Sequence, residues 1–106
     1  MITYYTKEGK FINSNLDNEP LPMKKLHRED GPALIYSFGV YVWFKEGKLH
    51  RLDGPAYISN TIAEKTKEYF INNKKLNIEE TESWIKNNNI NLKKKEHQIL
   101  FMLKFG

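Results

Sequence analysis

Hydrophobic and polar positions divide the chain into two parts with different periodicity. Up to residue 76, short runs rich in Tyr, Phe, Ile and Val alternate with clusters of Gly, Asn, Asp and Pro. This pattern predicts β-strands joined by tight turns. From residue 77 onward, apolar residues recur three or four positions apart, which predicts helices. We therefore expect an α+β fold in a single domain over 1–106, with antiparallel hairpins over 1–76 and a helical cap over 77–106.

Three segments place aromatic residues before a Gly or Asn turn that is followed by lysine. They are YYTKEGKF (4–11), VWFKEGKL (42–49) and YFINNKKL (69–76). This order is typical of a β-hairpin, with Gly47 or Asn73 supplying the turn. Residues 12–23, INSNLDNEPLPM, contain two prolines and several Asn and Asp residues, and we expect them to form an inserted surface loop.

One eight-residue segment occurs twice, as LHREDGPA (26–33) and as LHRLDGPA (49–56), at a spacing of 23 residues. The chain has 15 lysines but only two arginines, and both arginines occupy the same place in this segment. Such repetition indicates a structural unit that is used more than once. The motif residues that we expect to be structural are His27, Arg28, Asp30, Gly31, Pro32, His50, Arg51, Asp53, Gly54 and Pro55.

The chemistry of the motif predicts how it folds. Asp-Gly favours a tight turn with positive φ at Gly31 and Gly54, and the proline that follows fixes φ and directs the chain into strands at 33–37 and 56–59. The planar guanidinium of each arginine can bind the aspartate two residues later together with turn carbonyls. We expect these contacts to tie successive turns together, with the two histidines packed as stacked rungs.

The pair HREDGPA and HRLDGPA, each joined to an aromatic and Gly-Lys hairpin, resembles the HRxDGPA repeat proteins found mainly in bacteriophages and large DNA viruses. Those proteins are similar to a variant of the MORN repeat. The resemblance covers roughly residues 1–86, and residues 26–56 are its most specific part. It implies hairpins stacked into an elongated sheet, a last hairpin followed by an acidic helix with a tryptophan, and no common reaction.

The first helix has clear signals at both ends. Asn77 with Glu80 predicts an N-cap and capping box, and the run NNNIN breaks the pattern after residue 86. The residues predicted to share the inner face of this helix are Ile78, Thr81, Trp84 and Ile85.

The last segment, 92–106, fits a second helix. Its predicted inner face carries Leu92, Ile99, Leu100 and Leu103. Phe101, Met102 and Phe105 are then left on other faces. The segment therefore either covers the sheet as a lid or offers a hydrophobic surface to a partner, and it is also a candidate for pairing two copies of the chain.

Composition excludes several classes of protein. The absence of cysteine removes disulfide frameworks and thiolate zinc sites. No apolar run approaches the roughly 18 to 20 residues that span a bilayer. The first residues lack the charged and then apolar order of a signal peptide, so we expect a protein of the bacterial host's cytoplasm with no membrane contact. The net charge of +4 favours acidic partners.

Two chemical interpretations of the motif compete with a structural one. Two histidines and two aspartates suit a metal site, but the neighbouring arginine would repel a cation. His50, Arg51 and Asp53 could act as base, phosphate clamp and orienting group. Two copies that differ at one position favour a scaffold over a single convergent site, and we expect no enzyme activity, no metal and no cofactor.

Basic clusters make nucleic acid a candidate partner. Aromatic residues along the same sheet could add stacking surfaces. The alternative is that lysine is only the solvated residue of the surface, with the aromatics forming the core. The candidate nucleic-acid contacts are Lys24, Lys25, Lys74, Lys75, Lys93, Lys94 and Lys95.

The interpretation that we favour is a non-catalytic binding protein. The resemblance implies a phage or prophage origin, and the hypothesis is an inhibitor of a host defence effector, anti-CRISPR-like, that binds a nuclease or its guide-RNA complex. The alternatives are a protein that binds RNA or DNA by itself and an antitoxin-like partner of a toxin. The candidate partner-binding residues are Tyr41, Trp43, Tyr69, Phe101, Met102 and Phe105.

Overall fold

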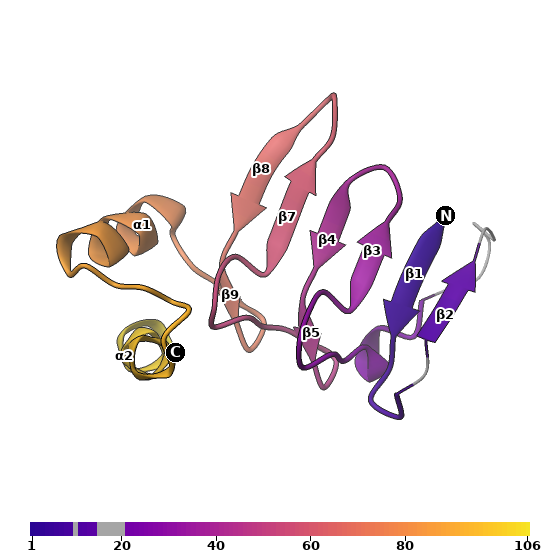
Figure 1. Ribbon diagram of the computed structural model, residues 1–106, viewed down its shortest axis with the longest axis horizontal. Coiled ribbons are helices and arrows are strands. Elements are labelled where there is room, and N and C mark those ends of the chain that lie inside the picture. Colours follow the sequence, from indigo (N-terminus) through magenta and orange to yellow (C-terminus); the bar gives the residue numbers. More distant parts are fainter. Residues whose placement is uncertain (10, 15–20) are drawn as a thin grey trace.

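The computed structural model describes residues 1–9, 11–14 and 21–106, with the backbone alone for 11–14. The molecule is elongated, with extents of 44 × 33 × 20 Å. Hairpins follow one another along the long axis, and two helices close one end (Figure 1). The expected α+β arrangement of stacked antiparallel hairpins followed by helices is confirmed.

Six strands form one antiparallel sheet in the order β2-β1-β3-β4-β7-β8. These strands are β1 (Ile2–Tyr5), β2 (Phe11–Ser14), β3 (Leu34–Tyr36), β4 (Val40–Val42), β7 (Tyr57–Asn60) and β8 (Lys65–Glu68). Two short hairpins lie beside the sheet, and we call them the side hairpins. They are β5 (Phe44–Lys45) with β6 (Lys48–Leu49), and β9 (Phe70–Ile71) with β10 (Lys74–Lys75).

Each full repeat unit therefore contains two hairpins, whereas the sequence pattern indicated one. A sheet hairpin (β3–β4 or β7–β8) comes first and a side hairpin follows. The turns of the sheet hairpins lack the Gly-Lys signal, so they were missed. Gly39 in the first of them has φ of 112°, and a Cβ there would lie 2.5 Å from the Asn60 carbonyl oxygen. Only glycine fits this turn against its neighbour.

The turns of the side hairpins confirm the prediction for Gly47 and Asn73. Both central residues have positive φ in each hairpin, Glu46 and Gly47 in one and Asn72 and Asn73 in the other. Two positive φ values are the mark of a type I′ turn, which matches the natural twist of a two-residue hairpin.

The predicted loop over 12–23 is only partly correct. Residues 12–14 belong to β2 and pair with β1, so the first hairpin, with its turn at Gly9, is part of the main sheet. Met23–Lys25 form a short 3-10 helix, η1. Leu21 and Pro22 have no regular secondary structure. The rest of the predicted loop, 15–20, lies outside the described residues.

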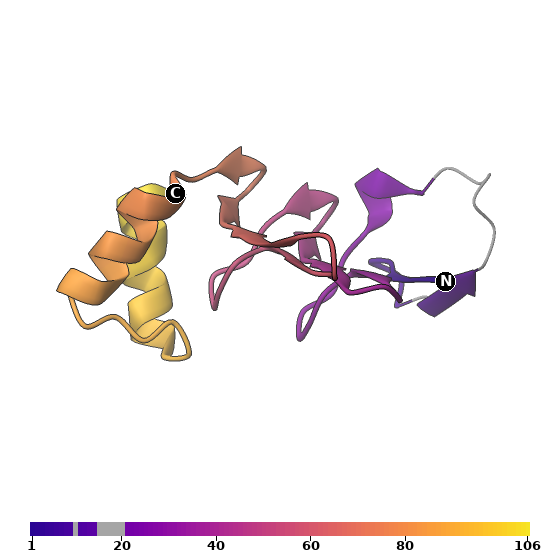
Figure 2. The same cartoon turned by 90° about the horizontal axis from the view of Figure 1, so that it is seen from above.

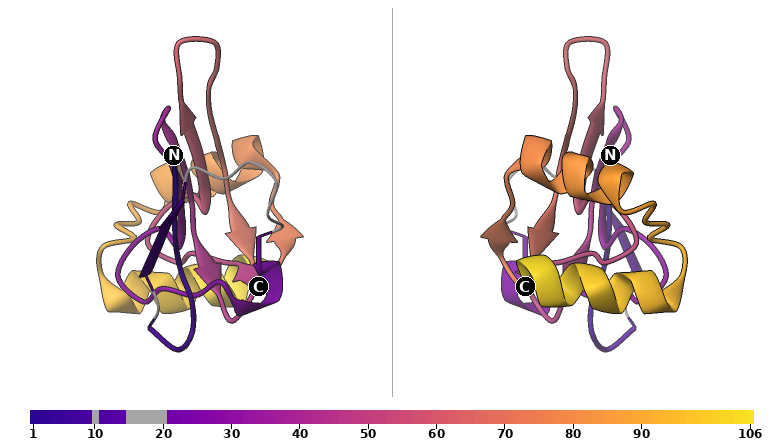
Figure 3. Two further views of the ribbon diagram at one scale, coloured as in Figure 1. Left: turned by 90° about the vertical axis from the view of Figure 1, so that its right-hand side faces the viewer. Right: turned by 90° about the vertical axis from the view of Figure 1, so that its left-hand side faces the viewer.

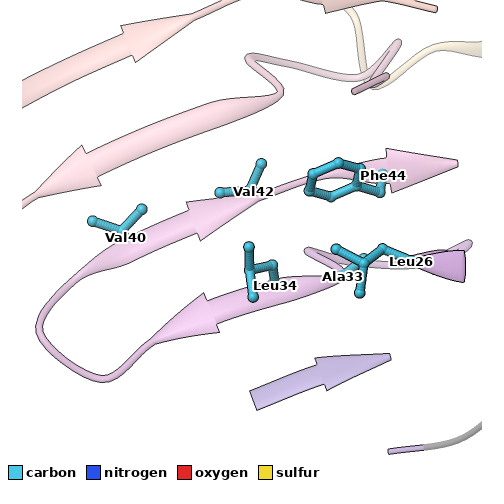
Figure 4. Close-up of a cluster of buried hydrophobic side chains, with 6 residues drawn as sticks. All are labelled: Leu26, Ala33, Leu34, Val40, Val42 and Phe44. Carbon is cyan, nitrogen blue, oxygen red and sulfur yellow. The ribbon is translucent and has the colours of Figure 1, made fainter. Parts of the chain in front are cut away.

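One side of the sheet carries the main core, and we call it the core face. Leu34, Val40 and Val42 come from the neighbouring strands β3 and β4 and belong to one buried cluster with Leu26 and Phe44 (Figure 4). These five side chains are less than a tenth exposed. The side hairpins and η1 lie on this side of the sheet (Figure 2), so the opposite side is left without a covering element in the described part of the chain.

The first helix, α1 (Ile78–Asn87), begins as predicted. The Asn77 side-chain oxygen accepts a hydrogen bond from the Glu80 N–H at 2.9 Å, and the helix ends where Asn89 adopts φ of 52°. Thr81 is fully buried, and Trp84 and Ile85 pack in the second core. Ile78 is 36% exposed, so its assignment to the inner face was wrong; it lies in the first turn, beyond the reach of that core.

The second helix, α2 (Lys95–Phe105), presents the face opposite to the predicted one. Phe101 and Phe105 are buried. The residues predicted to face inward are exposed instead, namely Ile99, Leu100 and Leu103. Of the predicted inner set, Leu92 alone packs in the core. The prediction failed because α2 is apolar on two sides, and the larger rings fill the space left by the last hairpin.

The two helices close the end of the hairpin stack rather than covering a face of the sheet (Figure 3). Their core joins Tyr69, Ile71 and Leu76 of the last hairpin to Phe101 and Phe105 of α2. Trp84 of α1 adds an edge-on contact to Phe105, with ring centroids 5.5 Å apart. The expected lid is thus an end cap.

Neither helix could span a bilayer, since α1 has ten residues and α2 has eleven. A span of the hydrocarbon core takes about 20 apolar residues.

Candidate functional site

The repeated motif makes the same stacking contact in both of its copies. The guanidinium of Arg28 lies 4.0 Å from the centroid of the Tyr5 ring, and that of Arg51 lies 3.9 Å from the Trp43 ring. In each case the ring belongs to the preceding unit. A cation over an aromatic face is an attractive contact of about 0.5–2 kcal/mol, so each arginine joins its own unit to the one before.

The other side of each arginine holds the turn in which it stands. Arg51 Nε donates to Asp53 at 2.7 Å and Arg51 Nη1 donates to the Pro55 carbonyl at 2.9 Å. Arg28 makes the same two bonds within its own turn, at 3.3 and 3.1 Å. The expectation that arginine and aspartate tie successive turns needs correction, because the carboxylate lies in the arginine's own turn and the aromatic ring provides the contact between units.

The motif glycines serve a different purpose from the predicted one. Neither Gly31 nor Gly54 is among the positive-φ residues of the described chain. A Cβ at Gly31 would lie 3.0 Å from Cζ of Arg28, and one at Gly54 would lie 2.9 Å from Cζ of Arg51. Glycine leaves room for the guanidinium, which is held between the ring and the backbone of the turn, so an added Cβ would displace it.

The motif histidines accept hydrogen bonds from the side hairpins, and their packing as stacked rungs stays a prediction. His27 Nδ1 accepts from the Glu46 N–H at 2.9 Å, and His50 Nδ1 accepts from the Asn72 N–H at 3.1 Å. Both amides lie in the tip of the neighbouring side hairpin. Each histidine therefore fixes a hairpin, and it does so with an unprotonated Nδ1, since a protonated ring has no acceptor.

Two motif residues have perturbed acidity. Burial lowers the pKa of the His50 imidazole, and the positive charge of Lys45 lowers it further. Burial acts to raise the pKa of the Asp53 carboxyl, but hydrogen bonding and charge from Arg51, with a contribution from Lys93, bring that pKa below its usual value. Both shifts follow from the roles of these groups in holding the turns.

The motif ends where the helical cap begins. Leu76 and Asn77 stand where the previous unit has His50 and Arg51, and the Leu76 N–H still donates to the Tyr69 carbonyl at 2.9 Å. Tyr69, the ring that would receive the next arginine, instead meets the ring of Phe101 at a centroid distance of 6.3 Å. Aromatic packing replaces the cation at the end of the stack.

Most of the aromatic partner-binding candidates are used inside the molecule. Tyr69 is buried and its hydroxyl donates to Glu82 at 3.2 Å, and burial together with this carboxylate raises the pKa of Tyr69 to about 12. Trp43 lies under Arg51. Phe101 and Phe105 are buried, so the assignment of these two rings and of Tyr69 to a partner surface was wrong. Met102 packs against them and is half-buried, as is Trp43, and the assignment of these two stays a prediction. Tyr41 has the largest exposure of the six candidates, at 38%.

The candidate nucleic-acid contacts lie on three separate elements and three of them are occupied. Lys74 donates to the Phe105 carbonyl at 3.2 Å, Lys75 pairs with Glu68 at 3.1 Å, and Lys93 lies 3.6 Å from Asp53. The other four, on η1 and at the start of α2, are exposed and have no ion pair in the described part of the chain: Lys24, Lys25, Lys94 and Lys95.

The side of the sheet opposite the core face carries a continuous row of side chains across five strands. The register joins these residues as direct cross-strand neighbours. We call it the Tyr41 row, and its members are Thr3, Ile35, Tyr41, Ile58 and Lys67. Tyr41 and Lys67 are exposed and the other three are half-buried. An open hollow with a volume of about 330 Å³ continues the row along β7–β8, lined by Ile58, Lys65 and Lys67 among others.

Within the described ranges, no three His, Asp or Glu side chains gather in a way that could hold a metal ion. Comparison with known proteins gave no family model, no curated protein and no solved structure that matches the chain. The geometry of the chain itself therefore has to indicate its function.

Replacing Arg51 with lysine should lower the free energy of unfolding by about 1–3 kcal/mol, because an ammonium cannot stack flat on Trp43 while donating to both Asp53 and Pro55. Arg28→Lys should cost less, since the Arg28 side chain is 27% exposed against 13% for Arg51. Denaturant unfolding would measure both, with the exposed Lys48→Arg as the control. Equal stability of Arg51→Lys and the unmodified chain would contradict the stabilising role of the Arg51 contacts with Trp43, Asp53 and Pro55.

Gly54→Ala should lower the free energy of unfolding by about 1–2 kcal/mol, because the added Cβ overlaps the Arg51 guanidinium. In a chain that already carries Arg51→Ala, the same change should cost much less, since the space is vacant. A double-mutant cycle in denaturant measures this coupling. Additive effects would mean that the glycine is needed for a reason other than the arginine.

Stability should fall at mildly acidic pH through His50. Its pKa is lower in the folded chain than the ordinary 6.5, so the unfolded chain binds the proton more readily. This contribution is complete above about pH 6.5 and is lost as the pH falls through that value towards the folded pKa. His50→Asn keeps an acceptor without titration, so its melting temperature should drop less between about pH 7 and pH 5. Equal drops in the two chains would refute the role of His50.

Proposed function

We propose that this protein is a non-catalytic binding protein, encoded by a phage or prophage, that inhibits a defence effector in the host cytoplasm. The target class is a CRISPR nuclease or its guide-RNA complex, which makes the protein anti-CRISPR-like. The resemblance of the motif pair to HRxDGPA repeat proteins supports the origin, and the net charge of +4 supports an acidic or RNA-containing partner.

The observation that carries this proposal is the Tyr41 row. It offers apolar and aromatic groups at its centre, on the side of the sheet opposite the core face. At its end Lys67 pairs with Glu82 of α1 at 2.7 Å, so the centre of the row is the part that is open to a partner. The Tyr41 hydroxyl has no hydrogen-bond partner among the described residues. An exposed tyrosine with a free hydroxyl, flanked by isoleucines, has the composition of a binding hot spot.

The motif residues support a binding role over an enzymatic one. The ring nitrogen, carboxylate and guanidinium groups of both copies are engaged in holding turns and neighbouring hairpins. A catalytic group must be able to reach a substrate atom. Here the same groups are committed twice to the same structural contacts.

A protein that binds RNA or DNA directly is the second candidate, and one observation favours it. Lys45 and Lys48 are direct cross-strand neighbours in the side hairpin β5–β6, and neither has an ion pair within the described residues. Like charges placed opposite each other are unfavourable in a hairpin. A bound phosphate backbone would remove this repulsion.

Capture of partners from the bacterial host with a tagged chain tests the proposal, followed by affinity measurement for the recovered effector. Tyr41→Ala should weaken the complex about tenfold or more, which corresponds to about 1.4 kcal/mol or greater. Phe38→Ala is the matched control, because Phe38 is a 63% exposed aromatic in the turn between β3 and β4. It should leave affinity unchanged.

Three results together would favour the second candidate, a protein that binds RNA or DNA directly. The chain would bind nucleic acid when no effector is present, the affinity would fall steeply with salt, and Lys45→Ala and Lys48→Ala would abolish binding. Equal affinity of Tyr41→Ala and the unmodified chain would reject the Tyr41 row as the binding surface. Melting temperatures of all variants establish that each one is folded.

A further inference from the structure

Helix α2 is apolar on two opposite sides. One side carries Phe101 and Phe105, which lie in the second core. The other side carries three aliphatic residues in the surface of the molecule, Ile99, Leu100 and Leu103, with exposures of 58%, 47% and 77%. We call these three residues the outer stripe. They lie within about one helical turn of one another, so they form a continuous apolar strip.

An exposed helix normally has a polar outer side, and a helix that is apolar all round is normally buried. In the isolated chain only one side of α2 is buried. The outer stripe contributes little to the fold, because its residues belong to neither core cluster of the described chain. It is therefore a surface suited to another molecule.

The charges along α2 indicate what that molecule is. The exposed Glu96 precedes the outer stripe and the exposed Lys104 follows it. Lys94 and Lys95 stand at the start of the helix, where the backbone dipole disfavours positive charge, while Lys93 is paired with Asp53. The last carbonyls at the other end carry partial negative charge, and Lys74 meets one of them, that of Phe105. Both ends of the helix therefore gain from contact with an opposite charge.

We propose that the outer stripe binds the same stripe of a second copy of this chain, with the two α2 helices antiparallel about a twofold axis near Leu100. Glu96 and Lys104 are each four residues from Leu100, so the axis brings Glu96 of one copy beside Lys104 of the other. Lys94 and Gly106 are each six residues from it. The lysines of each copy then meet the carbonyl end of the other helix.

The surface is self-complementary only in this direction. A twofold interface uses the same patch on both chains, and here one patch carries both signs of charge and the apolar residues between them. A parallel pair would place Glu96 against Glu96 and Lys104 against Lys104, with the helix dipoles aligned. In the antiparallel pair, the positive end of each helix dipole lies beside the negative end of the other, and this attraction favours the antiparallel arrangement.

The contact is small. An 11-residue helix is about 16 Å long, and the area buried by two such helices lies below the usual range for tight complexes. We therefore expect a weak, concentration-dependent dimer.

The Tyr41 row lies on the sheet, away from this contact, so dimerisation doubles the binding surface without blocking it. The dimer can therefore raise the avidity for a partner with two sites.

Sedimentation of the full chain over a roughly hundredfold range of concentration tests the proposal. The mass of the unmodified chain should rise from one copy to two. Leu103→Asp should remain a single copy throughout, because it would bury a charge in the contact. Ile62→Asp is the matched control, since Ile62 is fully exposed in the turn between β7 and β8, and it should pair like the unmodified chain.

A charge exchange tests the antiparallel direction. Glu96→Lys and Lys104→Glu should each weaken pairing when studied alone, because each then sets like charges together. In a parallel pair the unmodified chain already sets like charges together, so the single changes would not weaken pairing, and this loss is the result that identifies the antiparallel direction. An equal mixture of the two variants should pair more strongly than either. In the mixed pair, position 96 of each chain meets a side chain of opposite charge at position 104 of the other, so both contacts become attractive.

Three results would overturn the proposal: a constant mass of one copy for the unmodified chain, pairing by Leu103→Asp, or a mixture that pairs no better than the single variants. Tyr41→Ala should pair like the unmodified chain. Failure of the effector-binding function and failure of the dimer are therefore seen in different variants. Melting curves of dilute samples should match, because the outer stripe is mostly exposed within one chain.

Discussion

The structure depends on a guanidinium held between an aromatic ring and a glycine. On one side Arg51 stacks on Trp43 of the preceding unit, and on the other side it lies so close to the turn that a Cβ at Gly54 would overlap it. The same group donates to Asp53 and to the Pro55 carbonyl. A single side chain thus shapes its own turn and joins two units, and only a planar, multiply donating cation can do both.

This constraint explains how much of the repeat can be predicted from the sequence. The two arginines among 15 lysines, the motif glycines and the hairpin turns at Gly47 and Asn73 each have a local cause, so local pattern is enough to predict a repeated turn and a side hairpin. The partner of each arginine is a ring from the previous unit. That contact is set by stacking in space, and no local signal contains it.

The same limit explains the errors at the C-terminal end. The Asn77 cap depends on one turn of chain and was predicted correctly. The orientation of α2 depends on which of two apolar sides fills the space beside Tyr69 and Ile71, and periodicity alone cannot choose between them. The rings of Phe101 and Phe105 fill it because the missing arginine leaves an uncovered aromatic, which a second aromatic covers well.

Positions of the repeat at which the fold allows different side chains are the best candidates for residues that bind a partner. In the three units, Tyr5, Trp43 and Tyr69 share one position of the repeat, and all are aromatic because the stack requires a ring. Two residues earlier in each unit, the Tyr41 row has Thr3, Tyr41 and Lys67. The scaffold tolerates three different side chains there, so packing does not account for a tyrosine at the centre of the sheet. A side chain that the fold does not need, exposed beside two isoleucines, is best explained by a contact outside the molecule.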